Sequence, residues 1–213
     1  MSAHTALAGL RDYRDLALHG GRLPLDFINS VGAWFPRLER DYLTSYDDLL
    51  AWSVHAGALD AQAVAALRQA AARDPAAAQA VHRQALALRE ALHNLFAAVA
   101  RGESPTSQDT ARLNAALESA LPHRQVAASG EGFGWTWAGP PDALDRMLWP
   151  VVYEAADLLT ADERGRVREC PAPDCGWLFL DMSKNRSRRW CSMETCGNAA
   201  KARRHYQRHK GEG

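Results

Sequence analysis

Apolar residues recur at helical spacing through most of the first 163 residues of the chain. The longest stripe lies within residues 81–99, where Leu88, Leu92 and Leu95 are spaced by three and four positions. Residues with this spacing share one face of an α-helix, which is the face that a helix buries against a core. Similar stripes or helix-start signals predict further helices over residues 23–29, 47–54, 61–73, 107–117 and 144–159, with Pro150 as a point where the last one could kink.

The spacing changes to two within residues 126–137. Phe133, Trp135 and Trp137 alternate with small or polar residues there, after a turn that contains Gly130 and Gly132. Alternation behind such a turn is typical of a β-hairpin. We expect four tryptophans of the first 163 residues to be core residues rather than a ligand cage: Trp52, Trp135, Trp137 and Trp149.

The charge of the chain is divided unequally. The 213 residues hold 25 basic and 25 acidic side chains, yet residues 164–213 hold 12 basic and 5 acidic ones. Basic segments of this density commonly bind nucleic acid, although a solvated surface is the simpler interpretation. Because the first cysteine follows at position 170, we place a domain boundary here. The predicted domains are 1–163, mainly helical and suited to sensing or dimerisation, and 164–213, a small zinc finger.

Several classes of protein do not fit the sequence. No stretch approaches the roughly 20 apolar residues that a membrane span needs, and residues 1–10 lack the pattern of a signal peptide. We therefore expect a cytoplasmic protein without a membrane partner. Residue combinations typical of catalysis are also missing, with no glycine-rich phosphate loop and no nucleophile motif, so we do not expect an enzyme.

The four cysteines of the chain lie within 27 residues, in the spacing C-x4-C-x15-C-x4-C. Two close pairs separated by a longer loop can surround one tetrahedral ion, and four thiolates leave no open position for catalysis. Two disulfides or an iron–sulfur cluster are the alternatives that the count also allows. The sequence favours one structural Zn²⁺, held by Cys170, Cys175, Cys191 and Cys196.

The order of elements around these cysteines predicts the type of finger. Residues 177–181 read as a strand, 182–186 as a polar loop and 187–191 as a second strand that pairs with the first. Asn198 then reads as the cap of a helix that continues to about His209. A knuckle, a hairpin and a helix in this order resemble a treble-clef-like finger. The predicted fold class is thus α+β and mainly α, with a small hairpin in the helical domain.

Basic side chains come from two neighbouring elements of this finger. Since phosphate contact by two elements is more specific than one basic helix alone, we expect nucleic-acid binding here. The residues concerned are Lys184, Arg186, Arg188 and Arg189 in the loop, and Lys201, Arg203, Arg204 and Arg208 on the helix.

The chain resembles the CGNR zinc finger proteins with an N-terminal ABATE domain, which are regarded as stress-induced transcription regulators. The resemblance rests on Cys170-x4-Cys175, on residues 178–185 and 187–193, and on Cys196-Gly197-Asn198 followed by Lys201. Upstream, residues 25–30 resemble the family's opening LDFxNT, and residues 49–52 its later LLxW. One position departs from the pattern, because Ala199 stands where the family has the arginine of its name. Arg203 or Arg204 would have to make the DNA contact in place of that arginine.

The resemblance implies a stress-responsive regulator that binds duplex DNA. An RNA- or ribosome-associated protein and a protein-interaction adaptor remain alternatives, because a basic zinc module does not by itself select DNA. The helical domain would form a homodimer or bind a small-molecule effector. Asp26 and Asn29 share one helical face and are candidates for effector contact, although helix capping and local turns are the simpler interpretation.

Overall fold

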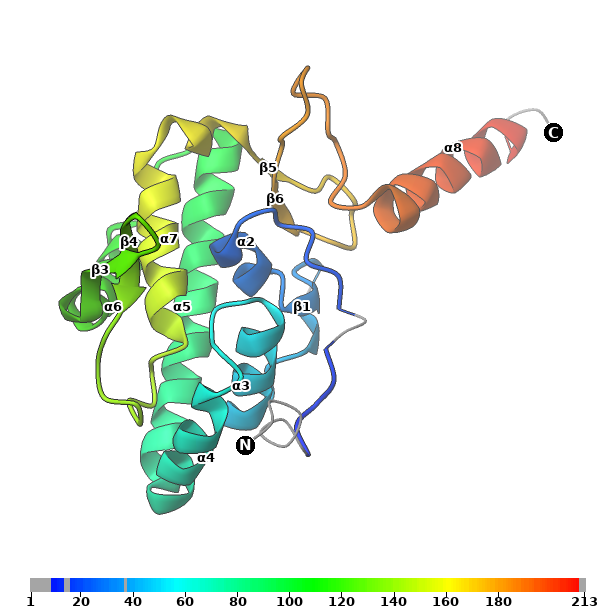
Figure 1. Cartoon of the computed structure of the whole chain (residues 1–213). Helices are drawn as coiled ribbons and strands as arrows, with labels where there is room; N and C mark the ends of the chain where they lie inside the picture. The colour runs from blue at the N-terminus through cyan, green and yellow to red at the C-terminus, as the bar shows by residue number, and fades with distance from the viewer. Residues whose placement is uncertain (1–8, 14–15, 37, 211–213) are drawn as a thin grey trace.

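The central element of the fold is the helix α5 (Pro75–Arg101), which runs through the helical body (Figure 1). The computed structural model describes residues 9–13, 16–36 and 38–210, without the side chains of Glu39 and of residues 208–210. Asp74 caps α5 by accepting a hydrogen bond from the backbone N–H of Ala77, and Gly102 ends it with φ of 70°. Glycine adopts this left-handed conformation without the strain of a side chain.

Five shorter helices surround α5, as the hydrophobic spacing predicts. They are α2 (Leu23–Ile28), α3 (Tyr46–His55), α4 (Ala63–Arg73), α6 (Ser107–Ala120) and α7 (Leu148–Thr160). Both α6 and α7 pack beside α5, and α2 packs against α7 and α5. Pro150 falls in the first turn of α7, where a missing N–H is tolerated, so the helix starts there instead of kinking. Within the described residues, no helix is both long enough and apolar enough to span a bilayer.

A short sheet of two strands connects α2 to α3 and was not predicted. β1 (Val31–Ala33) pairs antiparallel with β2 (Glu39–Asp41). The buried guanidinium of Arg89, on α5, donates to the carboxylate of Asp41 and to the backbone oxygen of Ser30. Three-residue strands are too short to show alternation in the sequence, and a buried ion pair joins segments that are far apart along the chain.

The predicted hairpin is confirmed, as β3 (Arg124–Ser129) and β4 (Gly132–Trp137). Trp137 lies at its base, with ring centroids 6.1 Å from Trp149 and 6.0 Å from Tyr153. The expectation for Trp135 is wrong, because its side chain is 60% exposed and that of Phe133 is 83% exposed. Only the base of the hairpin's apolar face, at Trp137, is therefore covered.

The strand pairing predicted within the finger is also wrong. β6 (Leu178–Leu180) pairs with β5 (Val167–Glu169), which precedes the first cysteine. Residues 187–190 form no strand, since the backbone N–H of Arg188 donates to the Asp181 carboxylate and Arg186 has a positive φ of 50°. The first half of the finger therefore forms its hairpin with a strand that lies before the first cysteine.

The core of the helical body continues into the finger. Val167, Leu178 and Leu180 are almost fully buried and belong to the same apolar cluster as the core residues of α5 and α7. A second, smaller cluster consists of three cysteines with Ala172 and Phe179. The finger thus has its own small core around sulfur, and its hairpin is anchored in the main core.

Candidate metal centre and its basic surroundings

The first two cysteines form the turn between β5 and β6. Cys170 and Cys175 are both buried, and the backbone N–H of Cys170 donates to the carbonyl of Trp177 across this turn at 2.8 Å. Gly176 follows with φ of 75°, and a Cβ there would lie 2.4 Å from the ring of Phe35. Only glycine fits both the conformation and the space at this position.

The second pair approaches the first from the end of the long loop. Cys196 lies in a wide turn, η3 (Met193–Gly197), which leads directly into α8 (Asn198–Lys210). Asn198 is therefore not the predicted N-cap, since it has helical φ and ψ and donates a hydrogen bond back to the Glu194 carbonyl. The turn brings Cys196 toward Cys191 and starts the helix at once.

The four sulfurs meet at one point. Cys191 Sγ lies 3.6 Å from both Cys175 Sγ and Cys196 Sγ, and all four sulfur atoms lie within 4.8 Å of one another. A zinc–sulfur bond of about 2.3 Å places the sulfurs of a tetrahedron about 3.8 Å apart, so the arrangement fits one Zn²⁺. Cys170, Cys175, Cys191 and Cys196 would hold it in a closed shell, in which the ion supplies folding energy and no free coordination position.

The knuckle is docked onto the helical body by polar contacts to its backbone. The N–H of Trp34 donates to the Cys175 carbonyl at 2.6 Å, and Trp177 Nε1 donates to the Val31 carbonyl at 3.0 Å. His93, on α5, places Nε2 3.3 Å from the Gly176 carbonyl and stacks on Trp34. Burial lowers the pKa of His93, so a neutral imidazole is favoured at this contact. The histidine was not singled out in the sequence.

Asp181 organises the basic loop. Its buried carboxylate accepts hydrogen bonds from the N–H and hydroxyl of Ser183 and from the N–H of Arg188. Burial by itself would raise the pKa of Asp181, but these three donors outweigh it and the pKa lies below its usual value. An ionised Asp181 therefore fixes the loop that presents Lys184 and Arg186.

Arg188 differs from the other arginines predicted to contact nucleic acid. Its guanidinium donates to the carbonyls of Leu180, Trp190, Cys191 and His19 and lies over the ring of Phe179. Each of these contacts is internal to the protein. We therefore assign Arg188 to holding the loop against the metal centre and remove it from the phosphate-contacting set.

The remaining basic residues are exposed around the finger. They are Lys184, Arg186 and Arg189 on the loop and Lys201, Arg203 and Arg204 on α8, while the side chain of Arg208 lies outside the described residues. Arg203 is 3.7 Å from Asp174, an exposed ion pair of small energetic weight. Figure 1 shows α8 projecting away from the body, next to the protruding loop. The structure thus places these basic groups on two neighbouring projections of one module.

Asp26 and Asn29, the effector candidates, have partners within the chain. Asp26 accepts a hydrogen bond from the N–H of Gly20 at 2.7 Å, and burial raises its pKa to about 6. The amide of Asn29 donates to the carbonyl of Leu178 at 2.7 Å and accepts from its N–H at 3.0 Å. Asp26 serves a local turn, whereas Asn29 joins α2 to β6.

Comparison with protein-family models gives two matches. Residues 21–162 match ABATE, described as "Putative stress-induced transcription regulator". The chain belongs to the ABATE family. Residues 166–209 match the CGNR zinc finger, so the ABATE domain and the finger follow one another as the resemblance implies. Among curated proteins, no match to the chain was found.

The two family matches divide this ABATE protein at residues 163–165, yet several connections cross that division besides the contacts of Trp34 and Trp177. Asn29 holds β6, His93 contacts Gly176, and Arg101 makes a bidentate ion pair with Glu169 at 2.7 Å. None of these partners is near in sequence, so no local signal could have revealed them. The zinc centre is therefore built on the ABATE domain and not merely appended to it.

Proposed function

We propose that this ABATE protein is a zinc-dependent transcriptional regulator that binds duplex DNA through its finger and responds to stress. The observation that carries the proposal is the helix α8. Its described side chains from Lys201 to Gln207 are all exposed, and the helix packs mainly on the preceding turn η3. A basic helix that a protein leaves uncovered has the dimensions to enter the major groove, and its 13 residues extend about 20 Å.

Phosphate contact is proposed around a hollow beside α8. Arg189, Arg203 and Arg204 line a cavity of about 240 Å³ together with the half-buried Trp190. Guanidinium groups from two elements can hold a phosphate between them, because each offers paired donors to its oxygens. Lys184 and Arg186 would reach the backbone further along the duplex. We propose this activity as binding by a cytoplasmic protein and not as catalysis.

One observation favours the RNA-associated alternative. Arg189 lies over the ring of Trp190, and Tyr206 is 70% exposed on α8. An exposed aromatic ring among arginines can stack on an unpaired base, which is how single-stranded RNA is commonly bound. Comparing the affinity for duplex DNA with that for single-stranded RNA therefore distinguishes the two alternatives.

The test measures affinity for random duplex DNA and for single-stranded RNA over a series of salt concentrations. Arg189→Gln/Arg204→Gln should weaken binding to all duplexes and reduce the slope of log K against log salt by about 2. The control Arg73→Gln/Arg83→Gln removes the same charge from the helical body and should leave the slope unchanged. Tighter binding of RNA than of duplex would favour the alternative. An adaptor would bind neither.

Dimerisation and sensing are the roles that we propose for the helical domain. One small finger offers few contacts, and typical non-specific affinities are only about 10⁻⁴–10⁻⁶ M. Two fingers on one DNA would supply higher affinity through their effective concentration. The proposed homodimer would form through residues 1–163, and selection of bound fragments from random duplexes should then yield a two-part site.

A further inference from the structure

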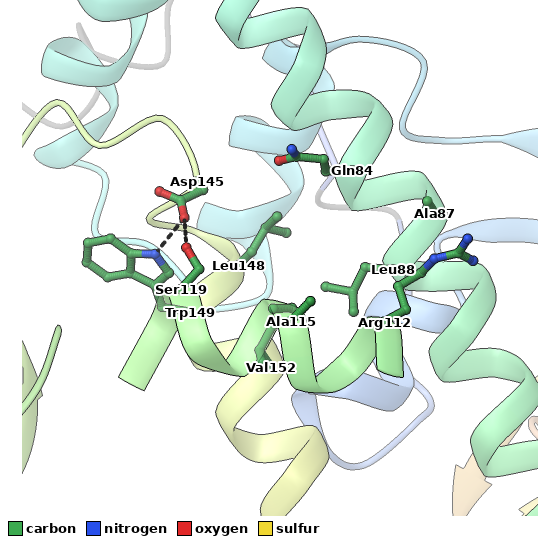
Figure 2. Close-up of a pocket in the computed structure, with 11 residues that line it drawn as sticks. Gln84, Ala87, Leu88, Arg112, Ala115, Ser119, Asp145, Leu148, Trp149 and Val152 are labelled. Atoms are coloured by element: carbon green, nitrogen blue, oxygen red, sulfur yellow. Dashed lines mark hydrogen bonds between the residues drawn. The ribbon is translucent and has the colours of Figure 1, made fainter. Parts of the chain in front are cut away.

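A cavity of about 330 Å³ opens between α5, α6 and α7, away from the zinc centre (Figure 2). Its volume lies at the lower end of the range for small-molecule sites. Most of its walls are apolar, with a few polar groups at the ends, which is the usual composition of such a site. The lining includes Leu88 on α5, Arg112 and Ser119 on α6, and Leu148, Trp149 and Val152 on α7.

The cavity exists because small side chains face one another where α5 and α6 approach. Ala87 on α5 and Ala115 and Ala116 on α6 all line it. Packed helices normally fill such a space with larger apolar side chains, since protein interiors reach the density of organic crystals. Alanine at all three positions leaves room beside the buried Leu88 and Val152.

One end of the cavity is acidic and already organised. Asp145 accepts hydrogen bonds from Ser119 Oγ and from Trp149 Nε1, both at 3.1 Å on the same carboxylate oxygen. Figure 2 shows these three side chains together at one end, with the apolar side chains between them and Arg112. The acidic end would repel a second anion, and it leaves the face of the cavity near Trp149 suited to an apolar group.

The other end of the cavity carries a positively charged side chain, that of Arg112. Arg112 is half-buried and makes no hydrogen bond or ion pair with any residue in the described part of the chain. Arg112 and Ser119 are seven positions apart on α6, which is two helical turns or about 10 Å. A guanidinium at the edge of an apolar space lacks the carboxylate that would normally accompany it.

We propose that this cavity binds a small monocarboxylic acid with an aromatic or aliphatic tail. The carboxylate would pair with Arg112, and the tail would lie over Leu88, Leu148 and Val152 toward Trp149. The distance of two helical turns, about 10 Å, limits the tail to a short carbon chain with or without one ring. Binding at this site does not depend on the DNA activity proposed above, and it can be tested without nucleic acid.

The test uses 4-phenylbutyrate as the probe and isothermal titration calorimetry on the full zinc-loaded chain. One molecule per chain should bind. The alcohol 4-phenylbutan-1-ol, which lacks the carboxylate, and suberate, which carries a second one, should each bind at least about tenfold more weakly. The indole N–H resonance of Trp149, assigned with Trp149→Phe, should shift on addition of the probe.

Two variants connect the binding to this cavity. Arg112→Met keeps the length of the side chain and removes its charge, so affinity should fall about tenfold or more, whereas Arg83→Met on the same helical body should bind as the wild type does. Ala115→Leu fills the space from an exposed position and should abolish binding without loss of zinc or of thermal stability. Wild-type affinity in either cavity variant, or no binding up to about 10 mM probe, overturns the proposal.

Discussion

The side-chain amide of Asn29 exchanges two hydrogen bonds with the backbone of Leu178, 149 residues further along the chain. In effect the amide completes the edge of β6 in the way a neighbouring strand would. Asn29 is almost fully buried, so neither partner has water as an alternative. The contact joins the first helix of the ABATE domain to the strand that leaves the zinc knuckle, and the stability of each part therefore depends on the other.

Replacing Asn29 with alanine should lower the free energy of unfolding by about 2–4 kcal/mol. The substitution leaves the N–H and the carbonyl of Leu178 buried without partners, and such groups cost more than the bond itself was worth. Urea denaturation of the zinc-loaded protein measures the change. Asn114→Ala, at an exposed position of α6, is the control and should change stability by less than about 0.5 kcal/mol. Equal effects of both substitutions would contradict the role of Asn29.

Loss of zinc should destabilise the whole chain and not the finger alone. Cys175→Ser should abolish zinc binding, measured as metal content per chain, where the wild type should hold one zinc. Because Leu178 and Leu180 are buried in the main core, we expect the melting temperature of the helical body to fall by about 10 °C or more. Retention of full zinc by this variant would refute the ligand assignment, and an unchanged melting temperature would show that the finger unfolds independently.

The sequence predicts features that depend on residues close together along the chain, but it does not predict contacts between residues that are far apart. Four clustered cysteines specify the metal, and the apolar stripe of α5 specifies the longest helix, because both signals lie within a few helical turns. The pairing of β6 with β5 and the hydrogen bonds of Asp181 depend on three-residue strands and on single side chains. Arg188 looks identical in sequence to Arg189, and only the carbonyls that surround it in the fold distinguish their roles.

Arg188→Ala should weaken zinc binding about tenfold or more, while the slope of log K against log salt for nucleic-acid binding should stay unchanged. The guanidinium holds the carbonyl of Cys191, and residues that position metal ligands commonly contribute this much affinity. Arg188→Lys should not restore zinc affinity, because one ammonium cannot reach four carbonyls. Competition with a chelator measures the affinity. A reduced salt slope with normal zinc affinity would return Arg188 to the phosphate-contacting set.

Ionisation of the buried Asp26 carboxyl should lower the free energy of unfolding as the pH rises from about 4 to about 6. Its pKa is about 6 in the folded protein, against 3.8 for an ordinary aspartate, mainly because the carboxyl is buried. Between these pH values the folded state keeps a proton that the unfolded state has lost. The free energy of unfolding therefore falls as the pH rises and stops falling above about pH 6.

The variant Asp26→Asn isolates this effect. It keeps an oxygen to accept the Gly20 N–H and carries no charge, so it should be more stable than the wild type at pH 7 by at most about 2–3 kcal/mol. The two proteins should become equal near pH 4. Thermal denaturation across this pH range is the measurement, and a pH dependence retained in full by Asp26→Asn would assign it to another group.

The hairpin β3–β4 is where we expect the proposed homodimer to form. Phe133 and Trp135 face the same side of β4, and both are largely exposed, as is their neighbour Val126 on β3. Aromatic side chains offer about 150–250 Å² each, so this face provides about half of the roughly 800 Å² per partner that a stable interface buries. Pairing of an open strand edge with its copy would add backbone hydrogen bonds.

Phe133→Ser/Trp135→Ser should therefore convert the dimer to a monomer in light scattering, with zinc content and helical circular dichroism unchanged. Leu18→Ser, an exposed apolar position away from the hairpin, is the matched control and should remain dimeric. A wild-type monomer that binds DNA tightly and specifically would rule the dimer out, and the helical domain would then be left with ligand binding alone.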